Sequence, residues 1–94
     1  MIAFEIYING KKRCTAGIGD LGVLSSILSW RGRQPDSSGA VPDSDSLVLD
    51  VGGFESTSRQ HSRWLEQDIC VGDEISIRVI ETDQADKPEE LYDA

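Results

Sequence analysis

Two alternating segments flank Asn9 and Gly10 near the start of the chain, in "AFEIYINGKKRCTAG". Phe4, Ile6 and Ile8 fall on one face of the first segment, as in a β-strand with one buried side. Asn-Gly accepts the positive φ angles of a tight type I′ turn, so the two segments are predicted to pair directly across it. A hairpin at residues 3–17 therefore constrains every fold open to this chain.

A third alternating segment follows a turn in "CVGDEISIRV". Gly72 and Asp73 suit the backbone angles of a turn, and Ile75, Ile77 and Val79 then alternate with polar residues. We therefore expect a strand that buries these three side chains. Asp73 and the glutamate after it point to opposite faces of an extended chain, so they do not form an acid/base pair.

"LVLDVGGF", residues 47–54, predicts another strand, with Leu47, Leu49 and Val51 inward and a glycine pair that ends it or introduces a bulge. "VLSSILSWR", residues 23–31, fits either a short helix or a strand. Its serines, β-branched residues and tryptophan are poor helix formers, and we favour the strand.

The chain has 94 residues, enough for one domain with a small core. We predict a mainly β fold over residues 1–80: a small antiparallel sheet or barrel-like sandwich with at most one short helix. Residues 33–46, rich in Pro, Ser and Asp, are predicted to form a flexible loop. "GIGDLG", residues 17–22, matches a dinucleotide-binding spacing but lacks the βαβ context, so we read it as a turn.

Acidic residues concentrate at the C-terminal end. The net charge is −8, and residues 81–94 hold six acids and one lysine, which leaves −3 for residues 1–80. We predict that residues 81–94 are a disordered acidic tail. Without a basic surface, nucleic acid is not an expected partner.

Cys14 and Cys70 are the two cysteines and His61 is the one histidine, so we expect no metal site and no disulfide framework. The first residues lack the pattern of a signal peptide, and no apolar run is long enough to cross a membrane. We expect a cytoplasmic protein with no membrane partner, no cofactor and reduced thiols.

A basic row in "ESTSRQHSRWLEQD" is the one candidate binding site. If this segment is extended, Arg59, His61 and Arg63 share a face that suits a carboxylate or phosphate, with Arg31 as a further candidate. The simpler interpretation is a solvated edge anchored by Trp64. No set of residues forms a catalytic pattern, and we expect no enzyme activity.

Two resemblances accompany these patterns. "FEIYING", "VGGFES", "RWL" and "VGDEISIRVIE" together resemble a group of small uncharacterised bacterial proteins over most of residues 4–88. That resemblance implies a bacterial cytosolic origin and no particular activity. The order of hairpin, possible helix, strand and "GDEISIRV" strand is similar to the ubiquitin-like β-grasp, the alternative α+β fold, in which residues 21–31 would form the helix. Sulfur carriers of that fold act through a C-terminal Gly-Gly, whereas this sequence ends in "KPEELYDA".

Two functions remain open. The preferred hypothesis is a noncatalytic protein-interaction module that binds another protein, with a homodimer through strand edges as a further possibility. The alternative is a small-molecule or anion-binding domain that uses the basic row.

Overall fold

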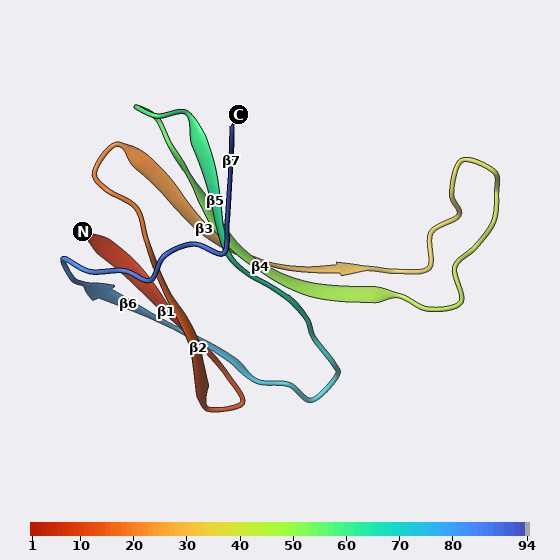
Figure 1. Cartoon of the computed structure of the whole chain (residues 1–94). Coiled ribbons are helices and arrows are strands. Elements are labelled where there is room, and N and C mark those ends of the chain that lie inside the picture. The colour runs from red at the N-terminus through yellow and green to blue at the C-terminus, as the bar shows by residue number, and fades with distance from the viewer. Residues whose placement is uncertain (94) are drawn as a thin grey trace.

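The computed structural model describes residues 1–93, which form seven β-strands and no helix (Figure 1). No helix in this part of the chain is therefore long and apolar enough to cross a membrane. The strands, in chain order, are β1 (Ile2–Ile8), β2 (Lys11–Gly17), β3 (Gly22–Arg31), β4 (Ser46–Glu55), β5 (Gln60–Asp68), β6 (Ile75–Glu81) and β7 (Glu90–Asp93).

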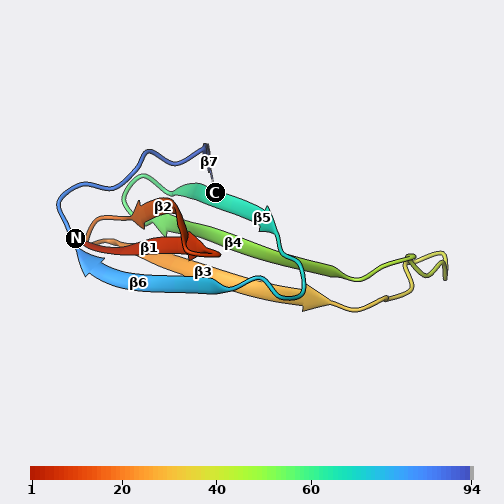
Figure 2. The ribbon, with the colours of Figure 1, turned by 90° about the horizontal axis from the view of Figure 1, so that it is seen from below.

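The strands make two antiparallel sheets that pack as two layers (Figure 2). The first sheet has the order β2-β1-β6, and the second has the order β3-β4-β5-β7. The predicted mainly β, antiparallel fold is confirmed. Each sheet keeps two outer strands, so the sandwich does not close into a barrel.

The N-terminal hairpin forms at the predicted turn. Asn9 and Gly10 have φ angles of 53° and 79°, and Ile8 pairs with Lys11 across them. A bulge after Ile6 places Arg13 as the extra residue on β2. Beyond the bulge, the alternation continues and directs Cys14 toward the core.

Replacing Gly10 by alanine is expected to lower the free energy of unfolding by about 1–2 kcal/mol, because the left-handed conformation disfavours a Cβ atom. A Cβ at Gly10 would meet no heavy atom within 4 Å, so backbone strain is the whole cost. Gly19 has equally open space without a positive φ, so Gly19→Ala is the matched control. Urea unfolding of both variants checks the prediction, and equal stabilities would contradict it.

Residues 22–31 form a strand, so the helix of the β-grasp alternative is not present. Each residue of β3 has a partner on β4, from Gly22 opposite Glu55 to Arg31 opposite Ser46. The hydrogen bonds of this ladder run along the whole segment on its β4 side and outweigh the modest helix propensity of its side chains. The sequence favoured the strand because its serines, β-branched residues and tryptophan are poor helix formers.

The core lies between the two sheets. Ile6, Leu49 and Val51 are its largest fully buried side chains, as their alternation predicts. β5 adds Trp64 and Leu65, which are consecutive but both buried because a bulge opposite Val51 makes Trp64 the extra residue.

The expected burial of β6 is wrong for most of the strand. Ile75 packs against the core, but Ile77 and Val79 expose 44% and 64% of their surface. β6 is the outer strand of its sheet, and only its first residues reach the core cluster. The alternation therefore predicts the correct face and overstates how much of it is covered.

The predicted disordered tail also differs from the structure. Residues 82–89, which we call the strap, run from β6 across one side of the sandwich, and β7 then pairs with β5 (Figure 1). Hydrogen bonds from Asp86 and Glu89 hold this segment against β2 and β5. Residue 94 lies outside the described residues.

The long connection between β3 and β4 extends away from the sandwich (Figure 1). Its tip is a turn in which the Asp36 carboxylate accepts hydrogen bonds from the backbone of Ser38 and Ala40. Arg33 Nε donates to the carbonyl oxygen of Pro42 across the base of the loop. Ser46, the last residue of the predicted loop, belongs to β4, and the flexibility of the loop stays a prediction.

Candidate functional site

The structure brings together only part of the predicted basic row. His61 and Arg63 lie on β5 and point to the outer face of the second sheet, whereas Arg59 lies in the turn before β5 with a φ of 55°. Arg31 is at the far end of β3, eight residues and about 27 Å along the sheet from the row that contains His61. The four residues do not form one site.

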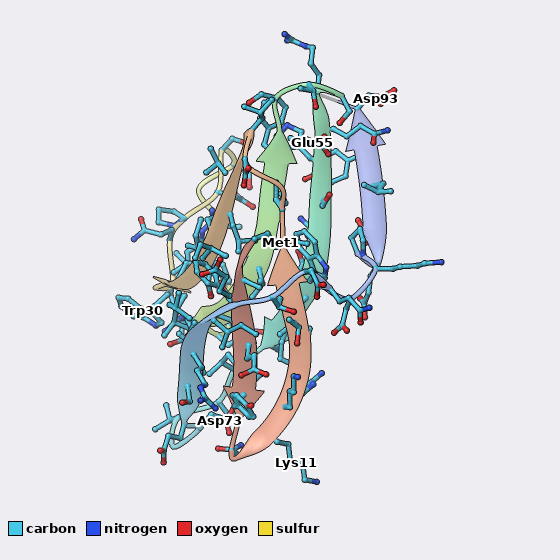
Figure 3. All side chains as sticks on the ribbon, turned by 90° about the vertical axis from the view of Figure 1, so that its left-hand side faces the viewer. Met1, Lys11, Trp30, Glu55, Asp73 and Asp93 are labelled. Carbon is cyan, nitrogen blue, oxygen red and sulfur yellow. The ribbon has the colours of Figure 1, made fainter. Side chains whose placement is uncertain are left out.

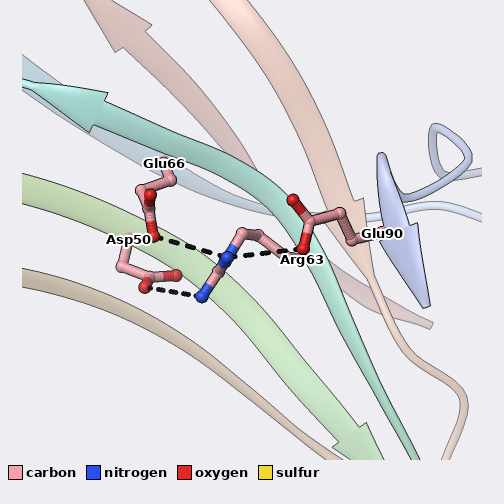
Figure 4. Close-up of polar contacts among 4 residues, drawn as sticks. All are labelled: Asp50, Arg63, Glu66 and Glu90. Carbon is pink, nitrogen blue, oxygen red and sulfur yellow. Dashed lines mark hydrogen bonds and ion pairs between the residues drawn. The ribbon is translucent and has the colours of Figure 1, made fainter. Parts of the chain in front are cut away.

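Arg63 is surrounded by carboxylates (Figure 4). Its guanidinium lies 3.6 Å from Asp50 and 3.4 Å from both Glu66 and Glu90. One positive charge among three negative charges leaves a negative cluster, which repels an anion. The predicted anion site at Arg63 therefore finds no support in this geometry.

A shallow hollow of about 290 Å³ lies beside this cluster on the outer face of the second sheet. Its aromatic wall is a cross-strand row in which the His61 ring stacks on Tyr92 at 5.1 Å and tilts against Phe54 at 4.9 Å. Gly52 forms the floor, where a Cβ would lie 2.7 Å from the Ser62 carbonyl oxygen. The hollow is at the lower limit for small-molecule sites, so ligand binding there stays a prediction.

Neither cysteine is part of a cluster. In residues 1–93 no group of three or more His, Cys, Asp or Glu side chains is placed to hold a metal ion. Burial, with a smaller contribution from Asp86, raises the pKa of the Cys14 thiol from 9.0 to about 11, whereas Cys70 is an exposed free thiol. Cys14 is thus a core side chain and a poor nucleophile.

Because of this raised pKa, the stability of the fold is expected to depend on pH in the alkaline range. The folded state holds the Cys14 proton more tightly than the unfolded state, so the free energy of unfolding is expected to fall as pH rises from 9 to 11. Urea unfolding across this window checks the fall, with Cys14→Ala as the variant that should lose this component. An identical pH profile for the variant and the parent would contradict the assignment.

One long side of the sandwich is closed by the chain itself. In the strap, the backbone N–H of Asp86 donates to the Thr15 carbonyl (2.9 Å), and the Asp86 carboxylate accepts from the Thr15 N–H (2.8 Å). The Asp86 carbonyl also accepts a 2.8 Å hydrogen bond from Trp64 Nε1. One residue thus joins β2 of the first sheet to β5 of the second, over the buried Trp64.

The opposite long side has no such cover. β3 and β6 are the outer strands there, and they lie along the same side of the molecule in two views (Figures 2 and 3). Their register directs four apolar side chains toward the space between the sheets, yet 44–66% of each remains exposed. We call this surface the open side: Leu28 and Trp30 on β3, and Ile77 and Val79 on β6.

A groove continues the open side toward the N-terminus. It has a volume of about 370 Å³ and runs between the starts of β1 and β3. Ile2, Phe4 and Leu24 line it with apolar surface, and Ile2 is 54% exposed. The apolar surface therefore extends beyond the four side chains of the open side.

The outer strands differ in how their edges are protected. β2 carries Lys11, Lys12 and Arg13 and is bonded to the strap, and β7 is only four residues long. Both are common ways to prevent unwanted strand pairing. β3 has no charged side chain from Gly22 to Trp30, and Arg78 is the one charge in β6 before Glu81. The two unprotected edges are the two that border the open side.

No family model, curated protein or solved structure matches this chain. The case for a site therefore depends on geometry. A self-contained sandwich covers its large apolar side chains, and the open side is the largest departure from this rule.

Sequence reasoning did not identify the open side. The apolar residues of β3 and β6 were recognised as strand faces, but the pairing order that leaves both strands at edges is not encoded locally. One signal was present: residues 22–30 are long, apolar in part and uncharged, which is unusual for an edge strand.

Proposed function

We propose that this protein is a noncatalytic protein-interaction module that binds a partner along its open side. The observation that carries the proposal is the contrast between the two long sides of the sandwich. One side is closed by the strap, and the other presents four exposed apolar side chains between two unprotected strand edges.

An extended segment is the form of partner that such a surface suits best. A strand added to β3 or β6 satisfies the free backbone groups of the edge, and every second side chain of the added strand then faces the apolar space between the sheets. Affinity comes from the backbone pairing and from burial of Leu28, Trp30, Ile77 and Val79. We also propose that the protein is bacterial and cytoplasmic, as the sequence predicts.

Charge at this surface is low, so burial and backbone pairing are the expected sources of affinity. Arg78 is the one charged residue among residues 75–80, and five of the six acidic residues of the C-terminal end lie in the strap and β7, on the closed side, with Glu81 at the end of β6. Binding at the open side is therefore expected to persist at raised ionic strength, unlike a contact between surface charges.

Affinity capture with matched surface variants tests the proposal. Val79→Lys places a charge in the middle of the open side and is expected to abolish partner recovery, because a buried unpaired charge is costly. Val71→Lys is the control: Val71 is 99% exposed in the turn before β6 and outside the open side. Circular dichroism confirms that both variants are folded.

Two outcomes would contradict the proposal. One is a stoichiometric partner that Val79→Lys and Leu28→Lys retain at full strength. The other is an equal loss of partner recovery with the Val71→Lys control, which would indicate nonspecific apolar adhesion rather than a defined surface. Deleting the C-terminal residues is not a clean test, because it removes the strap together with the charge.

A further inference from the structure

The free edge of β6 has a defined set of backbone groups. Met1 and Thr82 exchange two backbone hydrogen bonds, and the Asn9 N–H donates to the Glu74 carbonyl. In an antiparallel ladder such bonded pairs recur at every second residue, so the even-numbered residues of β6 bond to β1. The N–H and C=O groups of Ile75, Ile77 and Val79 therefore point outward from the sheet.

The same three residues carry the apolar side chains of the inner face. An incoming antiparallel strand must offer its own outward-facing residues to bond with them. A second β6 meets this condition in several registers. These registers differ in which side chains they bring together, and the matching of apolar side chains together with charge separates them.

A twofold axis at Ile77 gives the best match on the inner face. Ile77 then faces Ile77 of the second copy, and Ile75 faces Val79, so each of the three inner-face apolar side chains has an apolar partner. On the other face, Glu74 lies diagonal to Arg78 of the second copy, twice by symmetry. An axis at Arg78 would instead place two arginines opposite each other, and an axis at Val79 would place Glu81 opposite Ile77. An axis at Ser76 would pair Glu74 with Arg78 but place Val79 opposite Asp73.

We infer that a second copy of this chain occupies the β6 edge, in an antiparallel pairing centred on Ile77. This inference rests on the proposed function and names its partner at β6. The two three-stranded sheets would become one continuous sheet across the twofold axis. The pairing leaves the β3 edge available to another partner.

Oligomeric state measured by sedimentation equilibrium is the first test. The full chain is expected to be a dimer, and Ile77→Lys is expected to be a monomer because it places two ammonium groups opposite each other at the axis. Val71→Lys should dimerise like the parent chain. A parent chain that stays monomeric at high concentration would overturn the inference.

Charge reversal tests whether Glu74 lies beside Arg78 of the second copy. Arg78→Glu places carboxylates diagonal to each other at both symmetric positions, and we expect the dimer dissociation constant to rise about tenfold. Glu74→Arg should weaken the dimer similarly, and the double variant Glu74→Arg with Arg78→Glu should restore it. Weakening by both single variants without restoration would contradict the Ile77-centred register.

Cross-linking provides a second measure of the register. Directly opposed residues of a bonded pair have Cα atoms about 5.5 Å apart, within disulfide range. In a Cys70→Ser background, Ile77→Cys is expected to form a symmetric disulfide on mild oxidation. Val79→Cys is the control, because its two thiols would be four residues and about 13 Å out of register. Efficient cross-linking of Val79→Cys instead would refute the pairing.

The failure of this inference can be distinguished from failure of the proposed function. A monomeric protein that still loses a captured partner on Val79→Lys would overturn the homodimer alone. A dimer that Ile77→Lys leaves intact would place the self-contact elsewhere and also refute the inference. A monomer whose partner recovery is unchanged by every open-side variant would overturn both the inference and the proposed function.

Discussion

Replacing Trp64 by alanine is expected to lower the free energy of unfolding by about 3–5 kcal/mol. The indole is 4% exposed, lies at a bulge in β5, and donates a 2.8 Å hydrogen bond to the Asp86 carbonyl. Alanine leaves a cavity in the core and an unpaired carbonyl in the strap. Urea or thermal unfolding measures the loss.

The chain supplies its own control in Trp30. Trp30 is 66% exposed and bonds only to Asp45 in the loop, so Trp30→Ala is expected to cost about 1 kcal/mol or less. Trp64→Phe retains most of the packing and should isolate the indole hydrogen bond, at about 1 kcal/mol. Equal costs for Trp64→Ala and Trp30→Ala would show that the closed side is not the better packed side.

Truncating the chain after Glu81 is expected to lower the free energy of unfolding by about 3–5 kcal/mol, because it removes several backbone and indole hydrogen bonds worth about 1 kcal/mol each. The truncation removes both contacts of Asp86 with Thr15, its contact with Trp64, and the pairing of β7 with β5. It also uncovers the edge of β2. A disordered tail would make the same truncation nearly neutral.

The matched control removes charge and retains the strap. Asp83, Glu89 and Asp93 make no side-chain hydrogen bond or ion pair in the described residues, so their amide variants should leave stability within about 0.5 kcal/mol. Destabilisation by the truncation but not by the amide variants assigns the effect to the strap. The reverse pattern would contradict the role given to residues 82–89.

Local rules in the sequence predicted the strands well. Asn9-Gly10 determines the turn through backbone angles, and alternation correctly directed Ile6, Leu49 and Val51 into the core. The 22–31 segment was correctly favoured as a strand because its serines and β-branched residues oppose a helix. Each of these features depends on neighbours a few residues away.

The pairing of distant segments was beyond the same rules. Alternation at Ile77 and Val79 shows that they share a face, but only the sheet order shows that nothing covers it. The strap was missed for a related reason. Its acidic composition is typical of a disordered end, whereas Asp86 is held by partners from β2 and β5 that are far away in sequence.

The candidate site was predicted less well than the fold. His61 and Arg63 do share a face of β5, as two-residue spacing predicts. The carboxylates around Arg63 come from β4, β5 and β7, so its neutralisation could not be read from the basic row alone. Arg31 was grouped with them by charge and lies at the other end of the sheet.

Amide hydrogen exchange along β6, measured by NMR in dilute and concentrated protein, tests the central claim most directly. The outward-facing amides of Ile75, Ile77 and Val79 should exchange quickly when dilute and become protected on association. Those of Ser76 and Arg78, bonded to β1, are internal controls that should be protected throughout. Exchange at Ile77 and Val79 that stays fast at every concentration, and also in the presence of a captured partner, would contradict an interaction at the open side.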